Sequence, residues 1–378
     1  MSAAPIHILT HEFHPRRGGI ATVTEEMARA AASAGATVEV WAPAGPPDTA
    51  EPVWPFVVHR LPHRGTHDFR CVLATASAVV RERRRLRSAT IWLAEPGPML
   101  AMMALQWIPA FRPGRITLTF HGSEILRFHR NPLTRWLTRR LIGHATKVGT
   151  LTQYTRDLLC RHFPEAAAKV CLTPGAVRSV SAPAPKAAAT SPRDKVHILT
   201  VGRLHPRKGQ LQTLRALIAL PADLRTRIEY SIVGRAVRSG YAQDLRQVAT
   251  TADFPVHFRD DLDDRQLEDA YAQADIFAMT SIHHGLSVEG FGLVYLEAAA
   301  HGLPVVAHAI GGVGEAVVPD VTGLLVAPDD PAGLTTAFAR LIANPALRRR
   351  LGEAGRTWAR RHDWRDSARQ LFDLPAKP

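Results

Sequence analysis

The sequence predicts an α/β protein built from two doubly wound halves. Short apolar runs rich in Val and Ile alternate with segments of helical length, which is typical of buried parallel strands joined by helices. Residues 179–195, rich in Pro, Ala and Ser, interrupt the alternation and indicate a linker. After it, VHILTVG at 196–202 restarts the pattern that IHILT began at 6–10. A chain of 378 residues is also the right length for two domains.

Nine short apolar segments are expected to be strands. They lie at residues 6–10, 37–42, 90–94, 115–120 and 147–151 in the first half, and at 196–202, 229–234, 274–279 and 304–307 in the second. Ligands of doubly wound folds bind at the carboxyl ends of the strands. The loops after these strands are therefore where we expect the site, and a ligand between the halves would touch loops from both.

Composition predicts a globular, cytoplasmic protein. Hydrophobic residues make up 46% of the chain and charged residues 21%. The three cysteines, Cys71, Cys160 and Cys171, have no paired or metal-ligand spacing, which favours a reduced compartment. The N-terminal residues do not resemble a signal peptide, and the longest apolar stretch, 99–111, is too short to span a bilayer. We expect a soluble or peripherally attached protein.

The positive charge lies mostly in the first half. The net charge is +13; residues 1–180 hold 23 Lys and Arg against 12 Asp and Glu, and residues 181–378 hold 24 against 22. This asymmetry favours an anionic partner such as nucleic acid, anionic lipid or an acidic acceptor. The alternative is an arginine-rich solvated surface with no partner.

The loop after the first strand ends in a glycine pair. In HEFHPRRGGI, residues 11–20, Gly18 and Gly19 precede an expected helix at about 20–34. Paired glycines let the backbone approach a ligand, and a helix start offers free N–H groups to an anion. The loop is neither a GxGxxG fingerprint nor a GxxxxGK loop. A plain strand–turn–helix connection remains an alternative.

The loop after the first strand of the second half is basic. In VGRLHPRKG, residues 201–209, the cations Arg203 and Lys208 lie on an irregular loop and can converge on one spot. Two cations at a strand's carboxyl end suit a diphosphate. Arg207 is expected to face solvent. A basic surface turn is the alternative.

The segment 288–307, VEGFGLVYLEAAAHGLPVVA, carries two carboxylates in an apolar context. Glu289 lies just before an expected helix and Glu297 about one turn inside it. A carboxylate accepts from two hydroxyls at once, which suits the diols of a ribose or hexose. The helix start between them can hold a phosphate or sugar oxygen. That start comprises Gly290, Phe291, Gly292 and Leu293. Glu289 as a simple cap and Glu297 as a solvent-exposed residue form the alternative.

Two further motifs are weaker evidence of a functional site. His121 and Glu124, in TFHGSE at 119–124, could face one cleft, although a histidine after a strand is often only a turn residue. DDLDD at 260–264 contains an Asp-x-Asp pattern that binds metal in other folds. Here its aspartates fit better as caps of the helix that follows.

Together the motifs GGI, TFHGSE, GRLHPRKG, VEGFGLVYLEAAAHGLPVVA and GGVGE (311–315) resemble the family 4 glycosyltransferases. The resemblance spans nearly the whole chain. It implies the GT-B fold, in which two Rossmann-like, doubly wound domains face a central cleft. The implied parts are an acceptor-binding domain at 1–178, the linker at 179–195, a nucleotide-sugar-binding domain at 196–361, and a final helix at 362–378 that crosses back to the first domain.

The resemblance also implies roles for the candidate residues. Arg203 and Lys208 would bind the donor diphosphate, and Glu297 the ribose hydroxyls. Glu289 and the backbone at 290–293 would hold the transferred sugar and the distal phosphate. The implied catalytic residues are Glu289, Arg203, Lys208 and His121; the donor-binding residues are Gly18, Gly19, Arg203, Lys208, Glu289, Gly290, Phe291, Gly292, Leu293 and Glu297; and the acceptor-binding residues are His121 and Glu124.

The implied reaction is metal-independent hexosyl transfer, with retention, from a nucleoside-diphosphate sugar to a glycan or lipid-linked acceptor of the cell envelope or an exopolysaccharide. No cofactor is expected. The basic segments 79–88 and 127–141 are each expected to form one helix, and they suggest contact with an anionic membrane at its inner face, or else ordinary outer helices. The competing enzyme classes are a GT-B epimerase or phosphorylase and a soluble small-acceptor synthase. A nucleic-acid-binding protein would leave the second-half loops unexplained, so no nucleic acid is expected.

Overall fold

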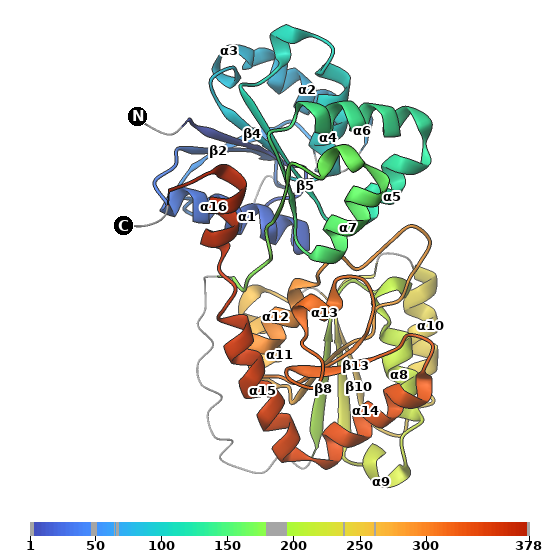
Figure 1. Ribbon diagram of the computed structural model, residues 1–378. Coiled ribbons are helices and arrows are strands. Elements are labelled where there is room, and N and C mark those ends of the chain that lie inside the picture. Colours follow the sequence, from blue (N-terminus) through green and yellow to red (C-terminus); the bar gives the residue numbers. More distant parts are fainter. Residues whose placement is uncertain are drawn as a thin grey trace. The chain divides into compact units, whose positions relative to one another are not determined.

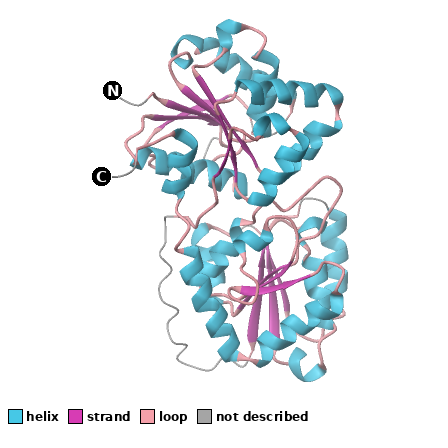
Figure 2. Cartoon of the chain, viewed as in Figure 1, coloured by secondary structure: helices cyan, strands magenta, loops and turns pink. Residues whose placement is uncertain are grey.

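The computed structural model describes residues 4–46, 51–63, 65, 68–178, 195–236, 239–260 and 262–375. The expected linker at 179–195 lies outside these residues except for Lys195. The chain divides into two compact units, Met1–Gly175 with Asp363–Pro378, and Ala176–His362. In each unit, helices cover both faces of a parallel sheet, as Figures 1 and 2 show.

The sheet of the first unit has seven strands within the described residues, and every pairing is parallel. Strands β1, β4 and β5 are the three middle strands, so the loops after them are neighbours at the carboxyl edge. In spatial order the strands are β3 (Val57–Leu61), β2 (Val38–Pro43), β1 (Ile6–Leu9), β4 (Thr90–Leu93), β5 (Arg115–Phe120), β6 (Lys147–Thr150) and β7 (Val170–Leu172).

The sheet of the second unit has six strands among the described residues, again all parallel. The loops after β8, β11 and β12 meet at its carboxyl edge. In spatial order the strands are β10 (Val256–Arg259), β9 (Ile228–Val233), β8 (Val196–Val201), β11 (Ile276–Met279), β12 (Val305–His308) and β13 (Gly323–Val326).

The helices follow the strands as in other doubly wound folds. The first unit contains α1 (Gly19–Ser33), α2 (Phe69–Arg81), α3 (Arg83–Leu86), α4 (Pro96–Leu105), α5 (Ser123–Arg130), α6 (Pro132–His144), α7 (Gln153–His162) and α16 (Trp364–Phe372). The second contains α8 (Gln210–Ile218), α9 (Ala222–Arg225), α10 (Ser239–Ala249), α11 (Asp264–Gln273), α12 (Leu293–Ala300), α13 (Val313–Ala316), α14 (Pro331–Ala343) and α15 (Pro345–Ala359). No helix of the described residues has the length and apolar character needed to cross a bilayer.

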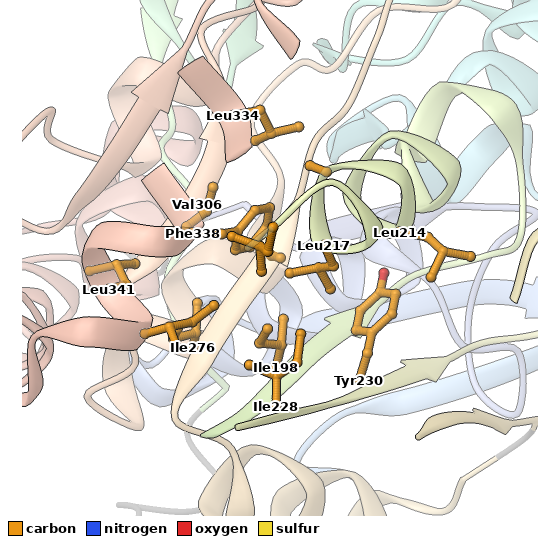
Figure 3. Packing of buried hydrophobic residues seen from close by; sticks show 14 of the residues in the cluster. Ile198, Leu214, Leu217, Ile228, Tyr230, Ile276, Val306, Leu334, Phe338 and Leu341 are labelled. Atoms are coloured by element: carbon orange, nitrogen blue, oxygen red, sulfur yellow. The ribbon is translucent and has the colours of Figure 1, made fainter. Parts of the chain in front are cut away.

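A continuous apolar core holds the second sheet against two of its helices. Strand residues such as Ile198 and Ile276 pack against Leu217 of α8 and Phe338 of α14, and all four are fully buried (Figure 3). Burying such a side chain contributes roughly 1.5–3 kcal/mol. The core therefore fixes the ends of β8, β11 and β12, from which the candidate site is built.

The last helix, α16, belongs to the first unit. It packs against α1, and Ser367 Oγ donates to the carbonyl of Pro174 at 2.7 Å. Just beyond it, Asp373 forms ion pairs of 2.5 Å with Arg115 and Lys147, at the amino ends of β5 and β6. The chain thus returns to its first unit after completing the second.

Each of the nine expected strands is present, with bounds shifted by two residues at most. The basic segment 127–141, however, is not one helix as expected. Helix α5 ends at Arg130 and α6 begins at Pro132, because Asn131 caps α6 through its side chain and proline is favoured in the first turn. The segment 79–88 is likewise divided between α2 and α3.

Candidate functional site

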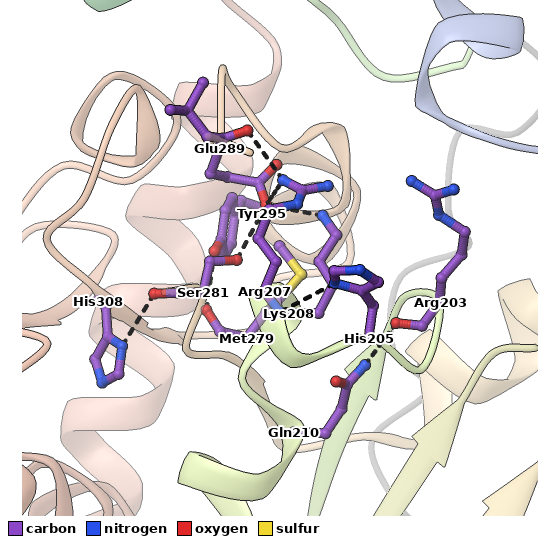
Figure 4. Close-up of polar contacts among 11 residues, drawn as sticks. Arg203, His205, Arg207, Lys208, Gln210, Met279, Ser281, Glu289, Tyr295 and His308 are labelled. Carbon is purple, nitrogen blue, oxygen red and sulfur yellow. Dashed lines mark hydrogen bonds and ion pairs between the residues drawn. The ribbon is translucent and has the colours of Figure 1, made fainter. Parts of the chain in front are cut away.

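Glu289 lies at the centre of a buried ion-pair cluster at the carboxyl edge of the second sheet. Its Oε2 accepts from Lys208 Nζ at 2.8 Å, Arg207 Nη1 at 2.9 Å and Ser281 Oγ at 3.0 Å (Figure 4). The Glu289 side chain is only 7% exposed. All three contacts fall on one oxygen, and Oε1 has no hydrogen-bond partner among the residues described. Oε1 is therefore the oxygen that can accept from a substrate hydroxyl.

The expectation that Arg207 faces solvent is wrong. Its side chain is 15% exposed, and besides Glu289 it contacts the carbonyl of Val288 at 3.1 Å. The reason is the short 3-10 turn Pro206–Lys208, which directs both Arg207 and Lys208 toward Glu289. The turn therefore places two cations of the basic loop against one carboxylate.

Two residues of the basic loop, His205 and Gly209, hold it in place. His205 Nδ1 accepts from the N–H of Arg207 at 3.1 Å at the start of the turn. Gly209 ends the turn with φ of +73°, and a Cβ there would lie 1.7 Å from the carbonyl oxygen of Thr280. No other residue fits that close approach between the loop and the end of β11. Gly209 thus brings Lys208 within reach of Glu289.

The charge of Glu289 is set by its cationic neighbours. Burial by itself would raise the pKa of this carboxyl, but Lys208 and Arg207 more than offset it, so its pKa lies below the usual value. For Lys208 the effect of burial exceeds that of the nearby Glu289 charge, so the pKa of its ammonium lies below the usual value. Glu289 is therefore ionised at neutral pH and prevents two cations from repelling each other in a buried place.

This balance predicts how stability depends on pH. A carboxyl with a depressed folded-state pKa stabilises the fold above its unfolded pKa of about 4.3, and that stability is lost as pH falls through the folded value. We expect the free energy of unfolding of Glu289→Gln to be below that of the wild type at pH 7, and the gap to narrow in acid. Denaturant unfolding at several pH values checks this. Glu353→Gln, at an exposed site, is the matched control; a gap that does not change with pH would contradict the assignment.

The glycine-flanked helix start is formed as the sequence predicts, with α12 beginning at Leu293. Gly292 precedes it with φ of +83°, and a Cβ at this position would lie 2.6 Å from the ring of Tyr295. Phe291 is buried, whereas Gly290 and Gly292 are partly exposed. The main-chain carbonyl of Glu289 accepts from Gly312 of the GGVGE motif at 3.0 Å. The free N–H groups of α12 therefore begin three to four residues after Glu289.

Glu297 belongs to a second polar cluster on the same helix. Its Oε2 accepts from the hydroxyl of Tyr271 at 2.9 Å. Tyr271 is buried and stacks on His301, with ring centroids 5.1 Å apart, and His301 in turn pairs with Glu268 at 2.9 Å. Burial raises the pKa of Glu297, an effect that the Tyr271 hydrogen bond partly offsets. Tyr271 therefore both orients Glu297 and helps keep it ionised.

Arg203 differs from the other cations of its loop. It is exposed, and its side chain forms no hydrogen bond or ion pair within the described part of the chain (Figure 4). Its main-chain carbonyl accepts from Gln210 Nε2 at 2.9 Å, which fixes the backbone. The guanidinium therefore remains available to an anion, while Lys208 is already paired with Glu289.

The candidate residues of the first unit lie at the carboxyl edge of its own sheet. Gly18 and Gly19 follow β1 and open α1, and a Cβ at Gly19 would meet no atom within 4 Å. His121 follows β5, and its Nε2 donates to the carbonyl of Ala94 at 2.9 Å, since a carbonyl can only accept. That bond leaves Nδ1 of His121 as the ring atom to face a substrate.

Glu124 was expected to share a cleft with His121, but it is buried. Its Oε1 accepts from the main-chain N–H groups of His121 and Gly122. In this structure it stabilises the turn that presents His121, so its effect on an acceptor would be indirect.

Sequence reasoning missed several residues of these clusters. Ser281 and Tyr271 hold the two glutamates, and buried Glu95 accepts from the main chain of His11 and Gly97 at the edge of the first sheet. A carboxylate directly after an apolar strand, as in TIWLAEPG, is a signal that could have identified Glu95. Nothing in the sequence pairs Tyr271 with Glu297.

The Asp-x-Asp segment contains a helix cap, as predicted. Asp263 accepts from the N–H of Gln266, and the Gln266 side chain accepts from the N–H of Asp263, so the two form a capping box for α11. Among the described residues, no three His, Cys, Asp or Glu side chains are grouped as metal ligands.

Comparison with known proteins agrees with this geometry. Residues 17–180 match the family described as Glycosyltransferase Family 4, and residues 183–358 match Glycosyl transferases group 1. A GDP-mannose-dependent alpha-(1-6)-phosphatidylinositol monomannoside mannosyltransferase of Mycolicibacterium smegmatis is 31% identical over 97% of both chains. A D-inositol 3-phosphate glycosyltransferase of Saccharomonospora viridis is 33% identical over 64% of this chain and 58% of its own.

Solved structures share the fold over nearly the whole chain. Sucrose-phosphate synthase from Thermosynechococcus elongatus has a TM-score of 0.81 at 23% identity, covering 98% of each chain. WaaG, a glycosyltransferase involved in lipopolysaccharide biosynthesis, has a TM-score of 0.72 at 17% identity, covering 98% of this chain and all of its own. The two parallel-sheet units are those of a GT-B glycosyltransferase. The chain belongs to the family 4 glycosyltransferases and uses a nucleotide sugar as donor.

Proposed function

We propose that this protein is a retaining, metal-independent mannosyltransferase that takes GDP-mannose as donor and a lipid-linked glycan of the cell envelope as acceptor. The observation that carries the proposal is the cluster in which Arg207 and Lys208 hold Glu289 beside the α12 helix start. The choice of donor and acceptor is supported by the full-length similarity to mannosyltransferases named for phosphatidylinositol mannoside.

The donor's leaving group would be a nucleoside diphosphate, whose charge increases as the glycosidic bond breaks. Lys208, the exposed guanidinium of Arg203 and the N–H groups that open α12 are preorganised donors for that charge. Oε1 of Glu289 would accept from a hydroxyl of the transferred sugar and orient its ring. Glu297 would bind the ribose hydroxyls, oriented by Tyr271.

No residue is proposed to act as a covalent nucleophile, so we explain retention by substitution on one face of the sugar. Oε2 of Glu289 is occupied by three donors, and Oε1 is assigned to a hydroxyl of the transferred sugar, so Glu289 acts as a positioning group and neither oxygen is assigned as a nucleophile. We therefore assign substitution on one face of the sugar, with the leaving phosphate taking the acceptor's proton. His121 would contact the sugar or the acceptor through Nδ1.

A binding and release screen tests the donor assignment. Thermal stabilisation and nucleotide release are measured with UDP-, GDP- and ADP-sugars, with and without EDTA. We expect stabilisation by GDP and GDP-mannose, and slow release of GDP that EDTA does not change. Stabilisation by another nucleotide alone would correct the donor, and no binding by any of them would refute the site.

A second acceptor class is favoured by one comparison. The similarity to D-inositol 3-phosphate glycosyltransferases suggests a water-soluble cyclitol phosphate instead of a lipid. Transfer of mannose from GDP-mannose to inositol phosphate, in preference to phosphatidylinositol mannoside in micelles, would favour it.

The competing epimerase class is tested in the same assay. An epimerase would change the sugar nucleotide with no acceptor present.

Tyr271→Phe should weaken donor binding without abolishing turnover. The change removes a hydrogen bond of 2.9 Å to a partly buried carboxylate, and a bond to a charged group contributes roughly 1.5–3 kcal/mol. We expect the Kd for GDP, measured by calorimetry, to rise about tenfold, with a much smaller change in kcat. Tyr230→Phe is the control, because that hydroxyl is also buried but bonds to Thr200 in the core. Equal effects of the two changes would show that Tyr271 is merely structural.

A further inference from the structure

The first unit carries an exposed apolar patch that neither the fold nor the donor site uses. Four large side chains form this aromatic patch: Trp107 (41% exposed), Ile108 (46%), Leu133 (62%) and Trp136 (53%). Leu133 and Trp136 lie one turn apart on α6, and Trp107 and Ile108 follow the end of α4, which packs against α6. Side chains of this size are costly to leave in water unless something covers them.

Neighbouring side chains hold the two indole rings of the aromatic patch in place. The rings of Trp107 and Trp136 stack with centroids 4.9 Å apart, and the Arg140 guanidinium lies 4.1 Å from the centroid of Trp107. Buried Gln106 donates to the carbonyls of Met103 and Leu137, at 3.1 and 3.3 Å, which ties the end of α4 to α6. The indoles are thus held in fixed orientations before any partner arrives.

The surroundings of the patch are strongly cationic. Between residues 105 and 147 the chain has eight Lys and Arg and a single acid, Glu124, which is buried. Arg127, Arg130 and Arg139 are exposed on α5 and α6. Arg139 pairs with Glu165 at 3.3 Å, and both of these side chains are more than two-fifths exposed. Two of the eight cations, Arg115 and Lys147, share the acid Asp373, so the region of the patch carries an excess of positive charge that is only partly neutralised.

We propose that the aromatic patch is the surface by which the enzyme docks on an anionic phospholipid bilayer. Indole rings favour the headgroup level of a membrane, and Lys and Arg side chains near an anionic surface are attracted to it. Docking of two copies through this face would bring the arginines of both together, which like-charge repulsion opposes. The proposal rests on the proposed function, since a lipid-linked acceptor requires the enzyme to work at a membrane.

Vesicle co-sedimentation of the full chain tests the proposal. The vesicles contain phosphatidylcholine alone or with phosphatidylglycerol, at low and high salt. We expect binding to the anionic vesicles at low salt, weaker binding at high salt, and little binding to neutral ones. The double variant Leu133→Ser/Trp136→Ser should bind at least about tenfold more weakly, equivalent to about 1.4 kcal/mol. Because both side chains are more than half exposed, thermal unfolding should hardly change.

The matched control is Phe69→Ser/Leu73→Ser, which removes two exposed apolar side chains from α2 of the same unit. Loss of binding in this control alone would move the contact to α2 and overturn the proposal, as would equal binding to neutral vesicles. A concentration-dependent dimer that the patch variant abolishes would instead assign the surface to a second copy. Release of GDP from GDP-mannose without vesicles, which the patch variant leaves unchanged, reports separately on the proposed donor site.

Discussion

Glu289→Gln should lower kcat by at least about 100-fold, equivalent to about 2.7 kcal/mol of barrier. The amide keeps the shape of the side chain but loses the charge that holds Lys208 and Arg207, so the sugar-facing oxygen and the phosphate-facing ammonium both lose their positions. Steady-state transfer or hydrolysis of the donor sugar measures the change. Near-normal turnover in a folded variant would refute the role of Glu289.

The stability effect of this substitution must be separated from its catalytic effect. Removing one member of a buried ion-pair cluster costs about 3–5 kcal/mol when the partner charges stay buried. Ser281→Ala is a matched partner variant, because it removes one hydrogen bond to the same Oε2 and leaves both cations paired. We expect a loss of turnover below about tenfold for it, with the Glu289 charge intact.

Lys208→Met should reduce kcat/KM for the donor by about 100- to 1000-fold, the usual effect of removing a preorganised donor to a developing charge. The methionine retains the apolar stem but not the ammonium. Arg207 remains to hold Glu289, so the variant should fold. The donor's KM and kcat and the Kd of the nucleoside diphosphate are measured together.

Two comparison variants separate the cations of the loop. Arg203→Gln should weaken nucleoside-diphosphate binding with no change in thermal stability, since this guanidinium is exposed. Arg207→Gln should act mainly through Glu289, with a smaller effect on nucleoside-diphosphate affinity than Lys208→Met. If Arg207→Gln weakens diphosphate binding more than Lys208→Met, the roles of these two residues must be exchanged.

The strands that the sequence predicts and those that it misses differ in one physical respect. All nine predicted strands lie inside a sheet, where both faces are covered and the residues form continuous apolar runs. The four missed strands, β3, β7, β10 and β13, are the edges of the two sheets. Edge strands are partly solvated; β10, for example, reads VHFR with no residue fully buried. Apolar patterning therefore identifies the interior of a sheet better than its limits.

The candidate site divides in a similar way. The glycines around Phe291 and the start of α12 follow from local backbone rules, so the sequence predicts them. The direction of Arg207 does not, because it depends on a 3-10 turn and on where Glu289 lies, 82 residues later. The burial of Glu124 was missed for a different reason: its contacts are local, and a carboxylate that accepts from its own turn has the same sequence pattern as one that faces a cleft.

The return of α16 to the first unit has a consequence for biosynthesis. Trp364, Leu371 and Phe372 are buried in that unit, and Phe372 packs edge-on against Trp92 of β4 at 5.5 Å between centroids. These residues leave the ribosome after the whole second unit has been made. Because synthesis proceeds from the N-terminus and domains fold as units, the second unit can complete its core first. The first unit is therefore translated before the second but completes its packing after it.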